Sequence, residues 1–209
     1  MIKDDEIIFN VGIVGDASVG KTCLLQKLLD KNFDLTINQP KPTIFISPSM
    51  FITSKDGKRI KIQFFDTAGA EKYHSVISNH LKSACAFLIV FDLTDEVSFD
   101  NVIYWKDQIK EHVDLNNIDL IMVANKCDLE NERKVTTNRI ENFEKKNQFG
   151  TNYLFYETSA KTGHGLDECV EGLVNKILTR YENLTDKNKI NQNIKLKKDK
   201  NKKSRICYF

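Results

Sequence analysis

Apolar runs of strand length alternate along the chain with segments whose apolar residues recur at helical spacing. The runs predict strands at residues 7–14, 44–53, 60–66, 84–91, 118–124 and 153–156. The intervening segments predict helices at residues 21–31, 98–112, 136–146 and 166–181. Apolar strands interleaved with helices of this length are typical of βαβ units. We therefore expect an α/β fold with a six-stranded, mostly parallel sheet and helices on both faces.

The stretch between the second and third expected strands contains a hairpin signal. Asp56 and Gly57 lie between two β-rich runs, and this dipeptide is typical of a tight turn between antiparallel strands. We expect one antiparallel edge strand in the otherwise parallel sheet. The three prolines, Pro40, Pro42 and Pro48, fall within nine residues and predict a loop that runs into the hairpin.

The apolar pattern ends near residue 182. Residues 183–209 are rich in Asn and Lys and cannot bury enough apolar surface to offset the entropy of ordering. We expect one domain over residues 1–182 and a disordered, polybasic tail over residues 183–209. Residues 185–209 carry nine Lys and Arg against two Asp, although the whole chain has a net charge of only +2. This distribution does not indicate nucleic-acid binding, which would spread basic residues over the folded part.

The cysteines and the N-terminus indicate a cytoplasmic protein. The number of cysteines, five, is odd, and no CxxC pair occurs, so neither a zinc site nor a disulfide framework is expected. The first ten residues lack the apolar run of a signal peptide. No stretch approaches the ~20 apolar residues that span a bilayer.

Residues 15–22 read GDASVGKT and fit the pattern GxxxxGK[ST], between an expected strand and an expected helix. The glycines let backbone N–H groups curl around a phosphate chain at the positive end of the helix. Lys21 would neutralise the outer phosphates, and the Thr22 hydroxyl would bind Mg²⁺. The alternative is a glycine-rich turn with an exposed lysine. The motif indicates a nucleoside triphosphate without identifying its base.

The residues that would select the base follow the strand at residues 118–124, where the chain reads Asn125-Lys126-Cys127-Asp128. Ligands of open α/β sheets bind outside the carboxyl ends of the strands. The Asp128 carboxylate can accept hydrogen bonds from the ring N–H and the exocyclic amine of guanine, and adenine has no such pair of donors. The Lys126 stem can lie along a face of the base. The alternative is a polar loop, but together with the phosphate loop these residues disfavour a P-loop kinase or ATPase.

These motifs resemble those of the small GTPases of the Ras superfamily, most closely the Rab family, over about residues 7–182. The resemblance implies the P-loop NTPase fold, GTP and GDP as ligands, Mg²⁺ as cofactor and a role in vesicle traffic. It also implies effector, exchange-factor and activating proteins that bind through the two switch segments. The chain departs from the Rab pattern after Thr43, so we expect a divergent Rab-like protein.

The resemblance assigns further residues. Phe33 would pack edge-on to the base, Asp66 and Thr43 would bind Mg²⁺, and Gly69 would contact the γ-phosphate. The expected nucleotide-binding residues are Gly15, Asp16, Ala17, Ser18, Val19, Gly20, Lys21, Thr22, Cys23, Phe33, Thr43, Gly69, Asn125, Lys126, Asp128, Ser159, Ala160 and Lys161. The expected metal ligands are Thr22, Thr43 and Asp66. The expected catalytic residues are Lys21, Thr43 and Gly69.

Ala70 departs from the family at the position of the glutamine that orients the attacking water. Alanine has no group for this task, so we expect slow GTP hydrolysis. Two alternatives stay open: an activating partner supplies the amide, or Glu71 replaces it. A second hypothesis is a mainly GTP-loaded binding platform with negligible hydrolysis.

The tail resembles a membrane anchor in part. Cys207 is third from the end, whereas a prenylation box places its cysteine fourth. Lipid attachment at Cys207 is one hypothesis, and the basic residues between 195 and 205 would attract an anionic membrane surface. We expect peripheral association with the cytoplasmic face of a membrane. The alternative is a charge run that only increases solubility.

Overall fold

The structure is a computed structural model, and it describes residues 6–34, 48–55, 58–66, 82–147, 153–186, 195–198 and 204–208. The strands are β1 (Glu6–Val14), β2 (Pro48–Lys55), β3 (Lys58–Asp66), β4 (Ala86–Asp92), β5 (Asp119–Asn125), β6 (Tyr153–Glu157), β7 (Lys195–Lys198) and β8 (Ser204–Tyr208). The helices are α1 (Lys21–Leu29), α3 (Glu96–Asp100), α4 (Val102–His112), α5 (Thr137–Asn147) and α6 (Leu166–Asp186), with a 3-10 turn η2 (Glu130–Glu132). No helix among the described residues is both long enough and apolar enough to cross a membrane.

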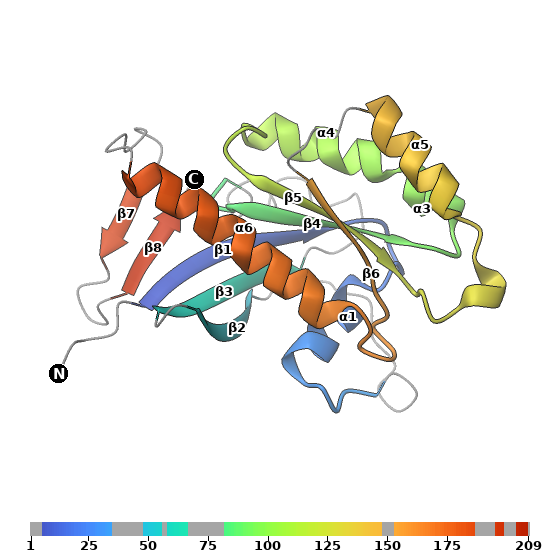
Figure 1. The fold of residues 1–209 in the computed structure, drawn as a ribbon, viewed down its shortest axis with the longest axis horizontal. Coiled ribbons are helices and arrows are strands. Elements are labelled where there is room, and N and C mark those ends of the chain that lie inside the picture. Colours follow the sequence, from blue (N-terminus) through green and yellow to red (C-terminus); the bar gives the residue numbers. More distant parts are fainter. Residues whose placement is uncertain are drawn as a thin grey trace.

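The six predicted strands lie in the order β2-β3-β1-β4-β5-β6 (Figure 1). β2 pairs antiparallel with β3, and the other neighbours in this order pair in parallel. The predicted fold class is therefore confirmed. β4 and β5 are buried at every position, as strands covered on both faces must be.

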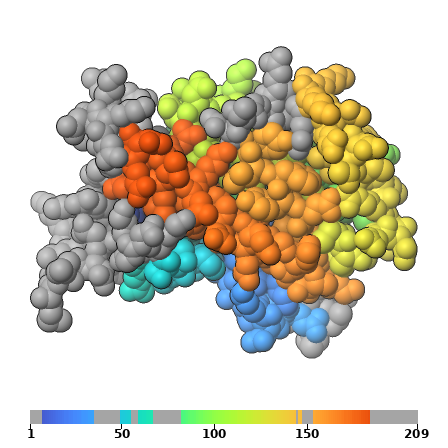
Figure 2. All heavy atoms as spheres, in the orientation of Figure 1, coloured from blue at the N-terminus to red at the C-terminus, as the bar shows by residue number. Residues whose placement is uncertain are grey.

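Helices cover both faces of the sheet. α1 and α6 pack on one face, where Leu28, Leu173 and Ile177 join a continuous apolar core. α3, α4 and α5 cover the other face over a second core that includes Phe99 and Ile109. Figures 1 and 2 show α1 beside α6 on one side of the molecule. The crossovers bring the carboxyl ends of β1, β4 and β5 to one edge, where the loops that carry the predicted motifs begin.

The prediction of a single helix over residues 98–112 was wrong in one respect, because the segment forms α3 and α4. Asp95 starts α3: its carboxylate accepts a hydrogen bond from the Val97 N–H at 3.0 Å. Ser98, the predicted first residue, lies inside α3, and its hydroxyl donates to the Asp95 carbonyl at 2.8 Å. The chain leaves α3 at Asn101 and enters α4.

Three ranges of the segment 183–209 differ from the expected disorder. α6 continues to Asp186, and β7 and β8 form an antiparallel pair. β8 lies parallel to the first half of β1, with Cys207 opposite Phe9 (Figure 1). β4 pairs with β1 only from Val11 onward, so the first half of β1 offers backbone donors and acceptors on that edge. Strand addition uses backbone groups, so the polar composition of the tail does not prevent it.

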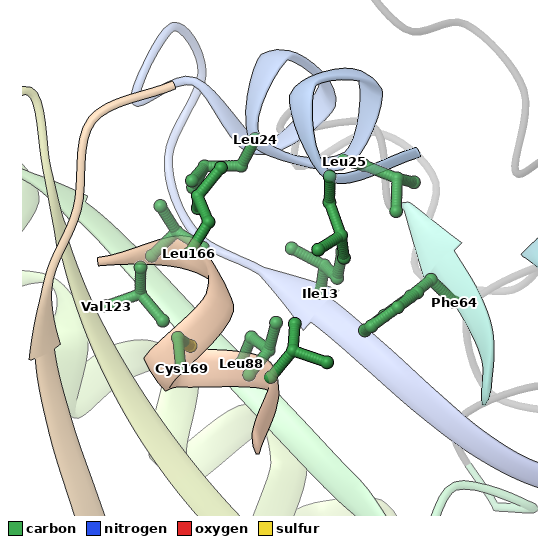
Figure 3. A pocket seen from close by; sticks show the side chains of 11 residues that line it. Ile13, Leu24, Leu25, Phe64, Leu88, Val123, Leu166 and Cys169 are labelled. Atoms are coloured by element: carbon green, nitrogen blue, oxygen red, sulfur yellow. The ribbon is translucent and has the colours of Figure 1, made fainter. Parts of the chain in front are cut away.

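A small apolar cavity of about 30 Å³ lies beside β1, between α1 and the start of α6 (Figure 3). Leu24, Leu25, Leu166 and Cys169 are among the side chains that line it. Cys169 is buried in this core, and burial raises the pKa of its thiol to about 12. A cavity lined by apolar groups stays dry, so we assign it to core packing and not to a ligand.

Candidate functional site

The loop at residues 15–20 approaches the ends of β4 and β5 so closely that it requires glycine. Gly15 has φ 143° and Gly20 has φ 97°, conformations that other residues rarely adopt. A Cβ atom at Gly15 would overlap the backbone carbonyl of Val90, and one at Gly20 would overlap the Asn125 amide. The two glycines therefore allow the loop to lie against the sheet.

Lys21 begins α1 and extends its ammonium group back over this loop. Its Nζ donates to the carbonyl oxygens of Gly15 at 2.8 Å and of Asp16 at 2.6 Å. Burial lowers the pKa of Lys21 to about 8, although the charges of Asp66 and Asp16 oppose the shift. A buried ammonium group at a helix N-terminus is an arrangement that attracts phosphate.

The side-chain oxygens of Thr22 and Asp66 lie close together, although the two residues belong to different elements. Thr22 Oγ1 donates to Asp66 Oδ2 at 2.6 Å, at the start of α1 and the end of β3. Hydroxyl and carboxylate oxygens are the ligands that Mg²⁺ prefers, and Mg²⁺ usually takes its other ligands from water and substrate phosphates. The pair therefore fits the predicted metal site.

Asn125, the last residue of β5, connects three loops. Its Nδ2 donates to the Val19 carbonyl at 2.8 Å, and its Oδ1 accepts from the Ala160 N–H at 3.2 Å. The residue is 1% exposed, so water does not compete for either bond. The phosphate loop, residues 125–128 and residues 158–161 are thus held at fixed distances from one another.

Asp128 is hydrogen-bonded to the loop that follows β6. Ser159 Oγ donates to Asp128 Oδ1 at 2.6 Å and accepts from the Lys161 N–H at 3.2 Å. The Cys127 N–H donates to the Thr158 carbonyl at 3.1 Å, which joins the two loops a second time. A carboxylate can accept several hydrogen bonds, so Asp128 can still bind the N–H donors of a base.

Lys126 forms an ion pair with Asp92 at the end of β4, with Nζ 2.6 Å from Oδ2. Asp92 Oδ1 accepts from the Thr94 N–H and from the Thr94 hydroxyl, each at 2.8 Å. The pair holds the head of Lys126, so its stem is restrained. The sequence motifs assigned no role to Asp92. Its position as an acidic residue directly after the predicted apolar strand was the signal that could have identified it.

Ser18 and Lys126 are the two non-glycine residues with positive φ in the described part of the chain, at 64° and 65°. Such conformations cost roughly 1–2 kcal/mol each. Both residues belong to the predicted nucleotide-binding set, and backbone strain of this kind concentrates at functional sites.

The Asp16 carboxylate is bound by residues of α4 and its N-terminus. Asn101 Nδ2 donates to Oδ2 and Trp105 Nε1 donates to Oδ1, each at 2.7 Å. The motifs predicted Asp16 as a nucleotide-binding residue but assigned nothing to Asn101 or Trp105. Asp16 itself was the signal in the sequence that such partners exist. A carboxylate in an anion-binding loop requires hydrogen-bond donors from elsewhere in the fold.

Other predicted site residues either have a position in the structure or lie outside the described range. Phe33 follows α1 and packs, partly buried, against the core on that side of the sheet. Cys23 lies buried in the first turn of α1. Thr43, Gly69 and Ala70 lie outside the described residues.

The fold and these loops define a P-loop nucleotide-binding protein, with the phosphate loop after β1 and an Asn-Lys-Cys-Asp loop after β5. A family model described as the Ras family matches residues 10–179. The chain is 34% identical over 180 residues to Ras-related protein Rab-13 of Rattus norvegicus, across 86% of this chain and 85% of that protein. It is 31% identical over 210 residues to Ras-related protein Rab-8B of Homo sapiens, across 100% of this chain and 98% of that protein. The chain belongs to the Ras family and is a Rab-like small GTPase.

Proposed function

We propose that this chain binds GTP and GDP with Mg²⁺ at the site around Lys21 and Asp128 and acts as a switch in membrane traffic. The observation that carries the proposal is the link through Asn125, which bonds to the phosphate loop and to the loop of Ala160. Ser159 connects that second loop to Asp128. The phosphate loop and Asp128 are thereby held in a fixed relative position, which binding of both the phosphates and the base of one nucleotide requires.

Asp128 would select the base of the nucleotide. Its carboxylate, oriented by the Ser159 hydroxyl, accepts from the ring N–H and the exocyclic amine of guanine. The Ala160 N–H, which donates to Asn125 Oδ1 at 3.2 Å, would be shared with the oxygen of the base. Lys126, held by Asp92 at 2.6 Å, would place its stem along the ring, and Phe33 would pack against the ring edge.

The phosphates would lie in the loop of residues 15–20. Backbone N–H groups and Lys21 bind the phosphate oxygens, because the Lys21 ammonium has a third donor besides the two that it directs to the Gly15 and Asp16 carbonyls. Thr22 and Asp66 would hold Mg²⁺, joined by Thr43 in the GTP state. When bound, the metal neutralises charge on the β- and γ-phosphates.

Hydrolysis would be slow, because Ala70 cannot orient water. Gly69 would still donate its N–H to the γ-phosphate, so binding does not depend on the missing amide. The second candidate function, a mainly GTP-loaded platform with negligible hydrolysis, is favoured by the same residue. Glu71 and an activating partner are the two candidate sources of a replacement group.

The proposal is tested by displacing a fluorescent GDP analogue from the full chain with unlabelled GDP, GTP and ATP in Mg²⁺. GDP and GTP should compete, and ATP should require at least about 100-fold higher concentration because two hydrogen bonds to a carboxylate are lost. ATP competing as well as GTP would contradict the assignment of Asp128.

The basic end of the chain would bring the switch to a membrane. Residues 195–205 contain seven Lys and Arg, each worth roughly 1 kcal/mol beside an anionic leaflet. A lipid on Cys207 together with this charge would make a stable anchor. Co-sedimentation with vesicles that contain or lack phosphatidylserine tests the electrostatic part. If the unlipidated chain binds neither kind of vesicle, the run only increases solubility.

A further inference from the structure

Asp16 places a carboxylate in a loop that binds phosphate. Like charges repel, so such a side chain should weaken binding unless it is kept away from the phosphates and satisfied elsewhere. Both of its oxygens are bound at 2.7 Å, one by the Asn101 amide and one by the Trp105 indole N–H. The residues that donate are 85 and 89 positions away along the chain.

The two donors come from one element. Asn101 precedes α4 and Trp105 lies four residues later, a spacing that puts both on the same side of the helix. The Asn101 side chain makes no capping bond to α4 within the described part of the chain, so its amide serves Asp16 instead. Trp105 is 8% exposed and packs edge-on to Tyr104, with ring centroids 5.4 Å apart. The donors are therefore rigidly held.

The main-chain carbonyl of Asp16 contacts Lys21, the lysine proposed to bind phosphate. Its carbonyl accepts from Lys21 Nζ at 2.6 Å, while its carboxylate is fixed to α4. Any displacement of this residue would move the carbonyl that positions Lys21. α4 is thereby connected to the phosphate-binding lysine through one residue.

We propose that Asn101 and Trp105 are positioning residues that hold the phosphate loop in its nucleotide-binding conformation through Asp16 and so slow the release of nucleotide. This inference rests on the proposed function, because it concerns the lifetime of the nucleotide complex. It gives α4 a role in retention of nucleotide that the sequence motifs do not assign.

The test uses the full chain loaded with a fluorescent GDP analogue, and dissociation is followed after addition of excess GDP at constant Mg²⁺. Trp105→Phe keeps an aromatic ring but removes the N–H, and Asn101→Ala removes the amide. Each change should increase the dissociation rate at least fivefold. Ile109→Val is the matched control: it removes a methylene from the core under the same helix, and should lower thermal stability while leaving the rate within twofold of wild type.

A second pair of variants separates positioning from general stability. In an Asp16→Ala background, Trp105→Phe should change the dissociation rate less than twofold, because the carboxylate through which it acts is gone. A full effect in that background would overturn the inference, as would wild-type rates in both single variants. If Trp105→Phe does not fold, Asn101→Ala decides alone. Failure of the wild-type chain to bind the analogue would instead overturn the proposed function, and this inference with it.

Discussion

We propose that Ala70 slows one chemical step, hydrolysis, without weakening nucleotide binding. Lys21 bonds to the Gly15 carbonyl, Thr22 bonds to Asp66, and Ser159 bonds to Asp128, all within the described residues. Orientation of the attacking water would depend on a side chain at position 70. Under this proposal, a change at residue 70 should alter turnover and not binding.

Ala70→Gln should accelerate GTP hydrolysis by roughly tenfold or more, which corresponds to about 1.4 kcal/mol in the barrier. Single-turnover hydrolysis at saturating Mg²⁺ measures this change directly. The affinity for GTP should be the same in both proteins and serves as the control. If the two hydrolysis rates agree within a factor of two, another group orients the water, and Glu71→Ala is the next variant to examine.

At the scale of elements, α6 is fixed to the sheet by a buried ion pair far from the nucleotide site. Arg180 Nη2 and Nε donate to the two carboxylate oxygens of Asp119 at 2.7 and 3.0 Å. Nη1 also donates to the Asn116 carbonyl at 2.8 Å. The Asp119 side chain is 2% exposed, so this carboxylate depends on the guanidinium.

Arg180→Ala should lower the free energy of unfolding by about 3 kcal/mol, because it leaves Asp119 buried and unpaired. Urea denaturation measures the loss. Arg139→Ala is the matched control: Arg139 pairs with Glu96 and Asp100 at the surface, where the loss should stay below about 1 kcal/mol. Equal losses in the two variants would contradict the assignment of the Asp119 pair as the stronger anchor.

The elements that could be predicted from sequence are those whose signals are local. Strands such as β4 and β5 are mostly apolar, and the motif loops follow strands directly, so the mostly parallel sheet and the positions of residues 15–22 and 125–128 at strand ends followed from the pattern. The apolar periodicity of the segment did not report the cap at Asp95, which starts α3 before the predicted helix, or the break at Asn101. β8 was missed because its pairing uses backbone groups, which composition does not report.

The partners of the site residues could not be predicted in the same way. Asp92 holds Lys126 from a different strand, and Trp105 reaches Asp16 across 89 positions. Such hydrogen bonds depend on how distant elements pack, whereas a motif records only neighbours along the chain. The sequence therefore predicted the loops that the fold brings together, but not the side chains that support them.

At the scale of the whole molecule, we expect the C-terminal strand β8 to add little to the free energy of unfolding. Each backbone bond between β8 and residues 6–9 contributes about 0.5–1.5 kcal/mol, and ordering each residue costs about 1–2 kcal/mol. Deletion of residues 187–209 should therefore change the free energy of unfolding by less than about 2 kcal/mol. Urea denaturation measures the change, and hydrogen exchange should show faster exchange in the first half of β1 without the tail.

Ile206→Pro is the matched control for that deletion, because it removes a backbone donor of β8 and keeps the charge of the tail. It should accelerate exchange in residues 6–9 as the deletion does. A loss of stability above about 4 kcal/mol on deletion would show that β8 belongs to the core sheet and is not a weakly held addition.

The central claim, that this site selects guanine through Asp128, is tested most directly by the base preference of Asp128→Asn. Competition of GTP and XTP for the full chain should show GTP affinity reduced by about 10- to 100-fold and XTP affinity increased, because the amide replaces one acceptor by a donor. Asp114→Asn, a change in an exposed loop, is the control and should keep the wild-type preference. An unchanged preference for GTP in Asp128→Asn would contradict the claim.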